Sequence, residues 1–263
     1  MKAHVVRVVV PIAPLLGEPR ASGTMTSQYL NGHRIDVLEG RDDWRRVQGP
    51  DAYEGWMHRG YLGDSVADLS SRLAGGHLLA QGSERLSLGC VARSHGGRVR
   101  ALPLGALLDP DEDALTGESA GAAELRRRFP AEPAAIVESA LRLYEGTSYL
   151  WGGVTPWGAD CSGFVQTVFA LHGIRTPRDA KDQAQYGVAA PHDPDALAPA
   201  DLVFFSDRED GRITHTAIAL GDARVVHLAL GRGGYAVENL RRGDGYATKL
   251  RERIRFARRI VGR

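Results

Sequence analysis

The sequence predicts a multidomain protein in which two small all-β domains precede a larger α+β domain. Short β-prone segments separated by Gly, Pro, Asp and Asn recur through the first 108 residues, which is typical of small barrels. Beyond residue 130, a helical periodicity is followed by further helical and alternating apolar stretches, as expected of an α+β fold. The length of 263 residues leaves room for this division.

The first predicted domain covers residues 1–64. Its β-prone segments are Val5–Val10, Arg34–Leu38, Trp44–Val47 and Gly55–His58. The stretch from Val37 to Val47, followed by Tyr53-Glu-Gly-Trp-Met57, resembles a bacterial SH3 domain. We expect Trp44 and Trp56 in the barrel core or along a groove, because large aromatic side chains favour both places.

Residues 65–108 are predicted to form a second, degenerate SH3-like domain. Leu86–Arg93, a turn at His95–Gly97 and Val99–Pro103 indicate two strands joined by a turn. Cys90 has apolar neighbours and is expected to be a small buried residue. Residues 109–129 are polar and are predicted to be a connector, with a short helix over Ala122–Arg128.

The main domain is predicted over residues 130–263. Ile136, Ala140 and Leu143 fall on one face of a helix that Gly146 ends. The basic stretch 241–263 interleaves apolar residues with arginines, and we expect a surface strand with a solvated face.

Composition excludes several classes of partner. The formal net charge of +1 does not steer the molecule toward nucleic acid or an anionic membrane. The apolar run before Pro11 is interrupted by Arg7 and is too short for a signal or membrane segment. Only Cys90 and Cys161 occur, which argues against a disulfide framework. We therefore expect a cytoplasmic protein with no nucleic-acid or membrane partner.

The candidate nucleophile is Cys161. Apolar residues from Phe164 to Leu171 predict a helix that ends near Gly173, and Asp160 and Ser162 suit its start. Cys161 then lies in the first helical turn, where the helix dipole favours a thiolate and free backbone N–H groups can hold an oxyanion.

Two histidines are the candidate partners of this thiol. Thr214–Leu220 is β-prone and places His215 at a strand start, and Val225–Ala229 indicates the next strand, which carries His227. Paired strands can bring the two rings together, with His215 as base and His227 as its orienting group. Because no Asp, Glu or Cys is placed to complete a metal site with them, we expect no metal and no cofactor.

Three motifs identify a family resemblance. Tyr149-x-Trp-Gly-Gly153, Asp160-Cys-Ser-Gly163 and Thr214-His-Thr-Ala-Ile218 resemble the NlpC/P60 cysteine peptidases over residues 130 to 263. The resemblance implies a papain-like α+β core, with Cys161 as nucleophile, His215 as general base and His227 as the polar third member. It also places Tyr149 near the thiol. We expect Trp151 in the core.

With two SH3-like domains ahead of it, the chain resembles the γ-D-glutamyl-L-diamino acid endopeptidases that recycle murein peptides. The expected substrate-binding residues around the thiol are Tyr149, Asp160 and Ser162. From Pro177-Arg-Asp-Ala180, the resemblance implies that Arg178 meets a substrate carboxylate and Asp179 the free amine. Tyr53 is expected to contribute from a barrel that closes the cleft.

Two positions depart from this branch. His33 follows Gly32 where an acidic residue is common, which leaves Glu39 or Glu54 as candidate acids for the substrate amine. Ala180 stands where a hydroxyl residue is common. Both changes affect specificity rather than chemistry.

The expected partners are murein peptides, L-Ala-γ-D-Glu-diamino acid, cut between D-glutamate and the diamino acid. A related thiol amidase or acyltransferase with another acyl donor is one alternative, since a nucleophile fixes the reaction type but not the donor. A catalytically inactive peptide-binding protein is another. The complete set of Cys161, His215 and His227 argues against the second, because a binding module has no need of it.

Overall fold

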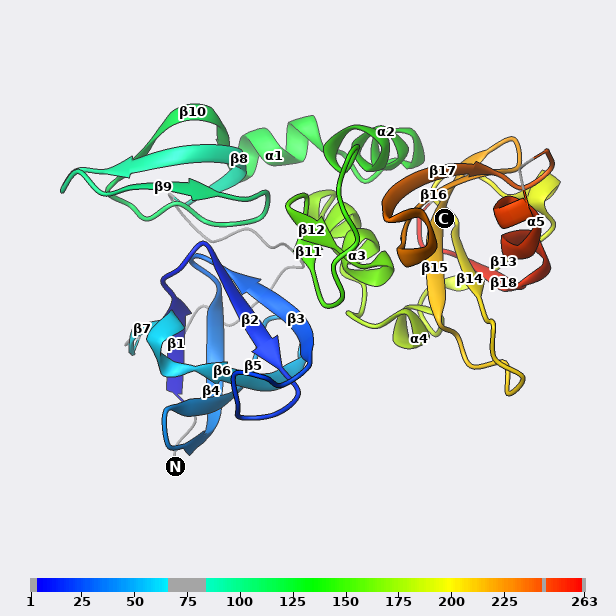
Figure 1. Cartoon of the computed structure of the whole chain (residues 1–263). Helices are drawn as coiled ribbons and strands as arrows, with labels where there is room; N and C mark the ends of the chain where they lie inside the picture. Colours follow the sequence, from blue (N-terminus) through cyan, green and yellow to red (C-terminus); the bar gives the residue numbers. More distant parts are fainter. Residues whose placement is uncertain (1–3, 66–83, 243–244, 262–263) are drawn as a thin grey trace. The chain divides into compact units, whose positions relative to one another are not determined.

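A computed structural model describes residues 4–65, 84–242 and 245–261. The chain divides into two compact units, Met1–Arg128 and Phe129–Arg263, whose elements are labelled in Figure 1. The boundary lies one residue before the predicted start of the main domain.

A coiled seven-stranded antiparallel sheet makes up most of the first unit. Its elements are β1 (His4–Val8), β2 (Ile12–Leu16), β3 (Met25–Leu30), β4 (Arg34–Arg41), β5 (Trp44–Gln48), β6 (Glu54–His58), the 3₁₀ turn η1 (Arg59–Tyr61) and β7 (Leu62–Ser65). The strand order is β3-β2-β6-β5-β4-β1-β7. Alternate residues of these strands bury a core around Val8, Leu15 and Met57. Trp44 and Trp56 are half-buried and lie outside that buried core.

A three-stranded sheet follows in the same unit. It consists of β8 (Arg85–Ser94), β9 (Val99–Leu102) and β10 (Glu112–Gly121) in the order β10-β8-β9, and α1 (Ala122–Arg128) comes next. The prediction of a connector is wrong over residues 112–121, because they pair with β8 as a strand, although half of these residues are exposed. Residues 66–83 lie outside the described residues, so a second SH3-like barrel stays a prediction.

Buried polar groups join this sheet to the seven-stranded one. The guanidinium of Arg100 on β9 donates to Glu112 Oε1 at 2.6 Å, to Asp109 Oδ2 at 2.6 Å and to Asn31 Oδ1 at 2.8 Å. Asn31 in turn donates from Nδ2 to the carbonyl of Leu107 at 2.6 Å. We call these four residues with Leu107 the polar joint. Buried polar groups hold two elements together well only when they are paired in this way.

The two residues after Asn31 explain the departure at position 33. Gly32 has φ +83°, and a Cβ there would lie 2.5 Å from Leu107 Cβ, so only glycine fits. His33 is buried, and its Nε2 lies 3.3 Å from the carbonyl of Gly105. Burial lowers the pKa of His33, which keeps the ring neutral. His33 therefore has a packing role beside the polar joint.

Tyr53 belongs to the first unit. It packs, half-buried, against the barrel core, its N–H donates to Asp51 Oδ1 at 3.2 Å and its carbonyl accepts the Tyr29 hydroxyl at 2.9 Å. The candidate acids Glu39 and Glu54 are both exposed and both lie against Arg46, at 3.7 and 2.7 Å. Their contributions to substrate binding stay predictions.

The second unit contains a six-stranded antiparallel sheet of order β13-β18-β14-β15-β16-β17. Its elements are α2 (Pro133–Leu143), β11 (Val154–Thr155), β12 (Gly158–Ala159), α3 (Cys161–Leu171), α4 (Ala180–Gln183), β13 (Val188–Ala190), η2 (Pro194–Ala196), β14 (Leu202–Phe205), β15 (His215–Gly221), β16 (Arg224–Ala229), η3 (Leu230–Arg232), β17 (Gly234–Asn239), α5 (Gly245–Glu252) and β18 (Ile254–Arg259). Helices α2 and α3 contact β15 (Figure 1). The middle strands β14, β15 and β16 are almost wholly buried, which explains their long apolar runs.

The strand expected in the basic C-terminal stretch is present as β18, but helix α5 precedes it and the strand does not lie at the edge of the sheet. Strand β18 lies inside the sheet, between β13 and β14. The guanidinium of Arg259 makes two 2.7 Å contacts with the buried carboxylate of Asp201, and Arg258 Nε donates to the Ala184 carbonyl at 2.8 Å. Arg258 and Arg259 are thus engaged within the chain. Among the described residues, no helix is both long and apolar enough to cross a membrane.

Candidate active site

The start of α3 positions Cys161. Asp160 is the N-cap, with extended backbone, and its Oδ1 accepts the N–H of Gly163 at 2.7 Å. Phe164 and Val168 anchor the helix because both are fully buried. Cys161 occupies the first helical position and is 7% exposed.

Residues 150–159 form a turn and a short hairpin that pack against the start of α3. A Cβ on Gly163 would lie 2.2 Å from the carbonyl oxygen of Gly153, so glycine is required at position 163. Asp160 N–H donates to the same carbonyl at 3.1 Å, and Gly152 N–H donates to Asp160 Oδ2 at 2.8 Å. The glycines of the Tyr-x-Trp-Gly-Gly motif thus hold the backbone against the nucleophile's helix. The expectation of a core position for Trp151 is wrong, since this side chain is 62% exposed.

A buried ion pair lies beneath the thiol. Arg178 Nη1 contacts Asp160 Oδ1 at 3.0 Å and Nη2 contacts Oδ2 at 2.7 Å, and Nη1 also reaches Ser162 Oγ at 3.0 Å. Arg178 is 2% exposed. The expected contact with a substrate carboxylate is therefore wrong for Arg178, because its guanidinium is buried against Asp160 and Ser162. Arg178 thus fixes the two residues that flank Cys161, Asp160 and Ser162.

The neighbouring segment completes that support. Gln183, fully buried on α4, donates from Nε2 to the carbonyls of Ser162 and Pro177, each at 2.9 Å. Sequence reasoning missed Gln183. Asp179 is the half-buried N-cap of α4, and its Oδ2 lies 3.8 Å from Lys181 Nζ. Its contact with a substrate amine stays a prediction.

The two histidines meet across neighbouring strands. His215 opens β15, His227 lies on β16, and His215 Nε2 is 2.7 Å from His227 Nδ1. The ring of Phe205 packs on His215 with centroids 5.5 Å apart. His227 is fully buried. The rings are held in one arrangement by this packing, as an orienting pair requires.

Burial disfavours the charged forms of both the thiol and the imidazole. Burial, and next the charge of Asp160, raise the pKa of Cys161 to about 12, although backbone N–H groups of Thr216 and Ser162 on the sulfur oppose this. Burial and the neighbouring His227 lower the pKa of His215 well below its usual value. Burial of the sulfur therefore opposes the helix dipole, which favours the thiolate.

Tyr149 lies beside the nucleophile. Its ring is half-buried, and burial together with the nearby Cys161 and Asp160 raises the pKa of its hydroxyl. Its backbone is fixed by donation from its N–H to the Gly233 carbonyl at 2.9 Å. The structure thus brings Tyr149, Asp160, Ser162, Cys161 and the two histidines into one region of the second unit.

Three further residues surround His227, and sequence reasoning missed all of them. Glu238 on β17 has Oε1 3.8 Å from His227 Nε2, and Arg232 grips the same carboxylate at 2.6 and 3.1 Å. Tyr246 of α5 lies under the Arg232 guanidinium, 4.4 Å from it, with its ring centroid 6.2 Å from that of His227. Charged residues on a short strand and its turn resemble a solvated face in sequence, so nothing indicated them.

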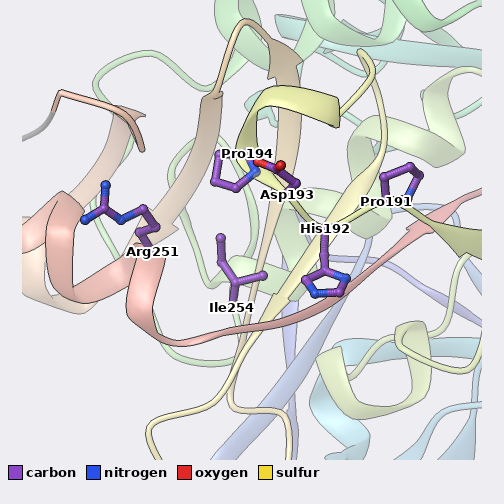
Figure 2. A pocket seen from close by; sticks show the side chains of 6 residues that line it. All are labelled: Pro191, His192, Asp193, Pro194, Arg251 and Ile254. Carbon is purple, nitrogen blue, oxygen red and sulfur yellow. The ribbon is translucent and has the colours of Figure 1, made fainter.

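A shallow hollow is lined by Pro191, His192, Asp193, Pro194, Arg251 and Ile254 (Figure 2). Figure 2 shows Arg251 and His192 on opposite sides of Ile254, so their polar groups do not converge. Across the described residues, no group of three or more His, Cys, Asp or Glu could hold a metal ion. The thiol and its histidines remain the candidate active site.

Comparison with known proteins supports this assignment. Residues 146–253 match the NlpC/P60 family and residues 15–62 match the bacterial dipeptidyl-peptidase Sh3 domain. A gamma-D-glutamyl-L-lysine dipeptidyl-peptidase from Bacillus cereus (strain ATCC 10987 / NRS 248) is 39% identical over 85 residues, which are 32% of this chain and 25% of that protein. The protein of the same name from Bacillus subtilis (strain 168) is 41% identical over 81 residues, 30% of this chain and 27% of the relative. The matched segments thus span about a quarter of each relative's length.

A solved structure extends the likeness of fold to the whole chain. The NlpC/P60 family protein from Bacillus cereus ATCC 10987 has a TM-score of 0.76 at 20% identity, covering 98% of this chain and 100% of that one. The motifs around Cys161 and His215 lie within residues 146–253, which match the NlpC/P60 family. The chain contains an NlpC/P60 domain, matched over residues 146–253, behind a bacterial dipeptidyl-peptidase SH3 domain, matched over residues 15–62.

Proposed function

We propose that this chain is a cysteine endopeptidase that hydrolyses the γ-D-glutamyl-L-diamino acid bond of murein peptides with a free N-terminal L-Ala. One observation carries the proposal. A thiol at the first position of α3 has the backbone N–H of Thr216 on its sulfur, next to His215, whose Nε2 is 2.7 Å from His227 Nδ1. A thiol on a helix beside an imidazole on a strand suits acyl transfer, which supports the proposal.

The reaction starts from the neutral pair. Cys161 Sγ bonds to the amide carbonyl carbon while its proton passes to Nδ1 of His215, and the carbonyl oxygen becomes an oxyanion. The C–N bond then breaks, and the same proton leaves with the amine. Water attacks the resulting thioester and gives a proton to His215. The sulfur leaves the carbonyl carbon and takes that proton back, which regenerates the thiol.

The start of α3 supplies a donor for the oxyanion. The first N–H groups of a helix have no partner within the helix. Gly163 N–H is bound to Asp160 and Ser162 N–H faces the sulfur. The N–H of Cys161 itself is therefore the group that we assign to the developing oxyanion, where a fixed donor stabilises the transition state most.

The substrate is proposed from the relatives. Two of them are named gamma-D-glutamyl-L-lysine dipeptidyl-peptidase, a name that describes release of a dipeptide at a γ-D-glutamyl bond. For a murein peptide that dipeptide is L-Ala-γ-D-Glu, so cleavage requires a free alanine amine. The family that matches residues 15–62 is the SH3 domain of bacterial dipeptidyl-peptidases, which supports the same substrate class.

Replacement of the reacting groups is expected to separate chemistry from folding. Cys161→Ala should remove nearly all hydrolysis of L-Ala-γ-D-Glu-L-Lys, and His215→Ala should lower kcat by at least about a hundredfold. His227→Ala should cost less, because water can replace part of an orienting group. Cys90→Ala is the matched control, since Cys90 is also a buried free thiol but lies in the first unit. Substantial activity in Cys161→Ala would exclude the mechanism.

Alkylation should report the neutral thiol. Because the pKa of Cys161 is raised to about 12, the rate of iodoacetamide modification should rise about tenfold per pH unit between about pH 7 and pH 10. The Cys161→Ala protein corrects for labelling of Cys90. Near pH 7, kcat/KM should vary little with pH, because the lowered pKa of His215 keeps its ring unprotonated there. An alkylation rate that is already constant from about pH 6 would indicate an ion pair instead.

The requirement for a free amine can be tested with matched peptides. N-acetylation of the alanine of L-Ala-γ-D-Glu-L-Lys should lower kcat/KM by about ten- to hundredfold, the usual effect of removing one charge-assisted contact. Acetylation of the lysine side chain controls for the added group. Equal kcat/KM for free and N-acetylated peptides would remove this specificity but leave the hydrolase assignment. Acylation of Cys161 by other donors alone would favour the acyltransferase alternative.

We also propose that the enzyme acts in the cytoplasm, on peptides recycled from the wall. Both cysteines are free, and a catalytic thiol has to stay reduced, as it does in that compartment. In fractionated cells the activity should copurify with cytoplasmic markers. Recovery with the wall or medium would contradict the recycling role.

A further inference from the structure

His227 has one nitrogen whose role the proposed mechanism leaves open. Its Nδ1 is 2.7 Å from His215 Nε2. Its Nε2 is buried and lacks a hydrogen-bond partner among the described residues. The carboxylate oxygen Oε1 of Glu238 lies 3.8 Å from that nitrogen. This distance exceeds a hydrogen bond but is short enough for the charge to act on the ring in a buried place.

Glu238 is built to stay charged. It is 5% exposed, and Arg232 contacts both of its oxygens, Nε to Oε1 at 2.6 Å and Nη2 to Oε2 at 3.1 Å. Burial raises the pKa of the Glu238 carboxyl, but the interactions with His227 and Arg232 outweigh it, so the pKa lies below its usual value. The carboxylate is therefore a fixed anion at neutral pH.

The contact between the two histidines allows two proton arrangements. In the first, His215 Nε2–H donates to His227 Nδ1, which leaves the proton of His227 on Nε2, toward Glu238. In the second, His227 Nδ1–H donates to His215 Nε2. The second arrangement turns the lone pair of His227 Nε2 toward a buried carboxylate, which is repulsive. It also leaves the proton of neutral His215 on Nδ1, so that nitrogen is unable to accept the proton of Cys161.

We propose that Glu238, held by Arg232, is a positioning residue that acts through His227 to select the first arrangement. This rests on the proposed function, because it concerns the base of that reaction. When His215 takes the proton of Cys161, the carboxylate also offsets the positive charge that appears on the ring pair. The four groups form a relay from β15 through β16 and β17 to η3.

The other groups around His227 do not replace Glu238. The charged or titratable neighbours are His215 on β15, Glu238 on β17, Arg232 on η3 and Tyr246 on α5. Burial raises the pKa of Tyr246, so its hydroxyl stays neutral at neutral pH. Of these four neighbours, Glu238 alone is an anion. A purely structural role remains the competing explanation, in which the Glu238–Arg232 pair only ties β17 to its turn.

The first readout needs no catalysis. In ¹⁵N spectra of the histidine rings, His227 should carry its proton on Nε2 in the wild type. Glu238→Gln removes the charge at nearly constant volume and should populate both arrangements, whereas Glu238→Asp should keep the first one. An unchanged tautomer in Glu238→Gln would overturn the proposal. A shifted tautomer would support it even if the wild type failed to cut murein peptides, which would contradict the proposed function alone.

The second readout is kinetic and uses a control of matched burial. Glu238→Gln should lower kcat about ten- to hundredfold with KM nearly unchanged, and Glu238→Asp should restore part of it. Asp201→Asn breaks another buried pair, in which Arg259 makes two 2.7 Å contacts, and should lower Tm while leaving kcat unchanged. A loss of kcat in Asp201→Asn that equals the loss in Glu238→Gln at equal Tm would support the structural explanation and overturn ours.

A third variant keeps the proposal testable if the Glu238→Gln protein does not fold. Arg232 is 30% exposed in its side chain, so Arg232→Gln should be tolerated. It frees the carboxylate from its partner and should shift the same ring signals and lower kcat by a smaller factor. Unchanged ring signals and unchanged kcat in Arg232→Gln would contradict the relay.

Discussion

The buried pair of Asp160 and Arg178 is the interaction on which the catalytic end of the second unit depends. The carboxylate of Asp160 caps α3 through Gly163, receives the N–H of Gly152 and takes two contacts from Arg178. One side chain thus joins the nucleophile's helix, the Tyr-x-Trp-Gly-Gly turn and the segment that leads to α4. Removing either charge leaves the other buried without a partner, which typically costs about 3–5 kcal/mol.

The same pair sets the electrostatic conditions of the thiol. Burial is the largest cause of the raised pKa of Cys161; the charge of Asp160 raises that pKa further, and the smaller effect of Arg178 lowers it. A neutral thiol exposes no reactive thiolate until a base removes its proton. Reactivity therefore depends on how well His215 is held and on the arrangement of its protons, more than on the dipole of α3.

Local signals predicted the parts of the site that local sequence determines. The Asp-Cys-Ser-Gly cap and the apolar run after it placed Cys161 at a helix start, and alternation placed His215 and His227 on successive strands. These local signals did not identify partners that are distant in sequence. Nothing in the sequence tells that Arg178 pairs with Asp160 18 residues away, and β10 was missed because its exposed face reads as polar loop. A charge reveals its partner only in three dimensions.

The polar joint of the first unit bears on how this chain can be divided. Arg100 and Glu112 lie on one sheet, Asp109 lies between β9 and β10, and Asn31 follows β3 of the other sheet. Removing Arg100 would take a donor from the buried side chains of Glu112 and Asn31. A protein that ends after residue 64 would lack Leu107, against which Gly32 packs, and would expose Gly32 to water. In gene fusions or domain exchanges, residues up to Arg128 should therefore be kept together, and the boundary after Arg128 is the place where the chain can be divided.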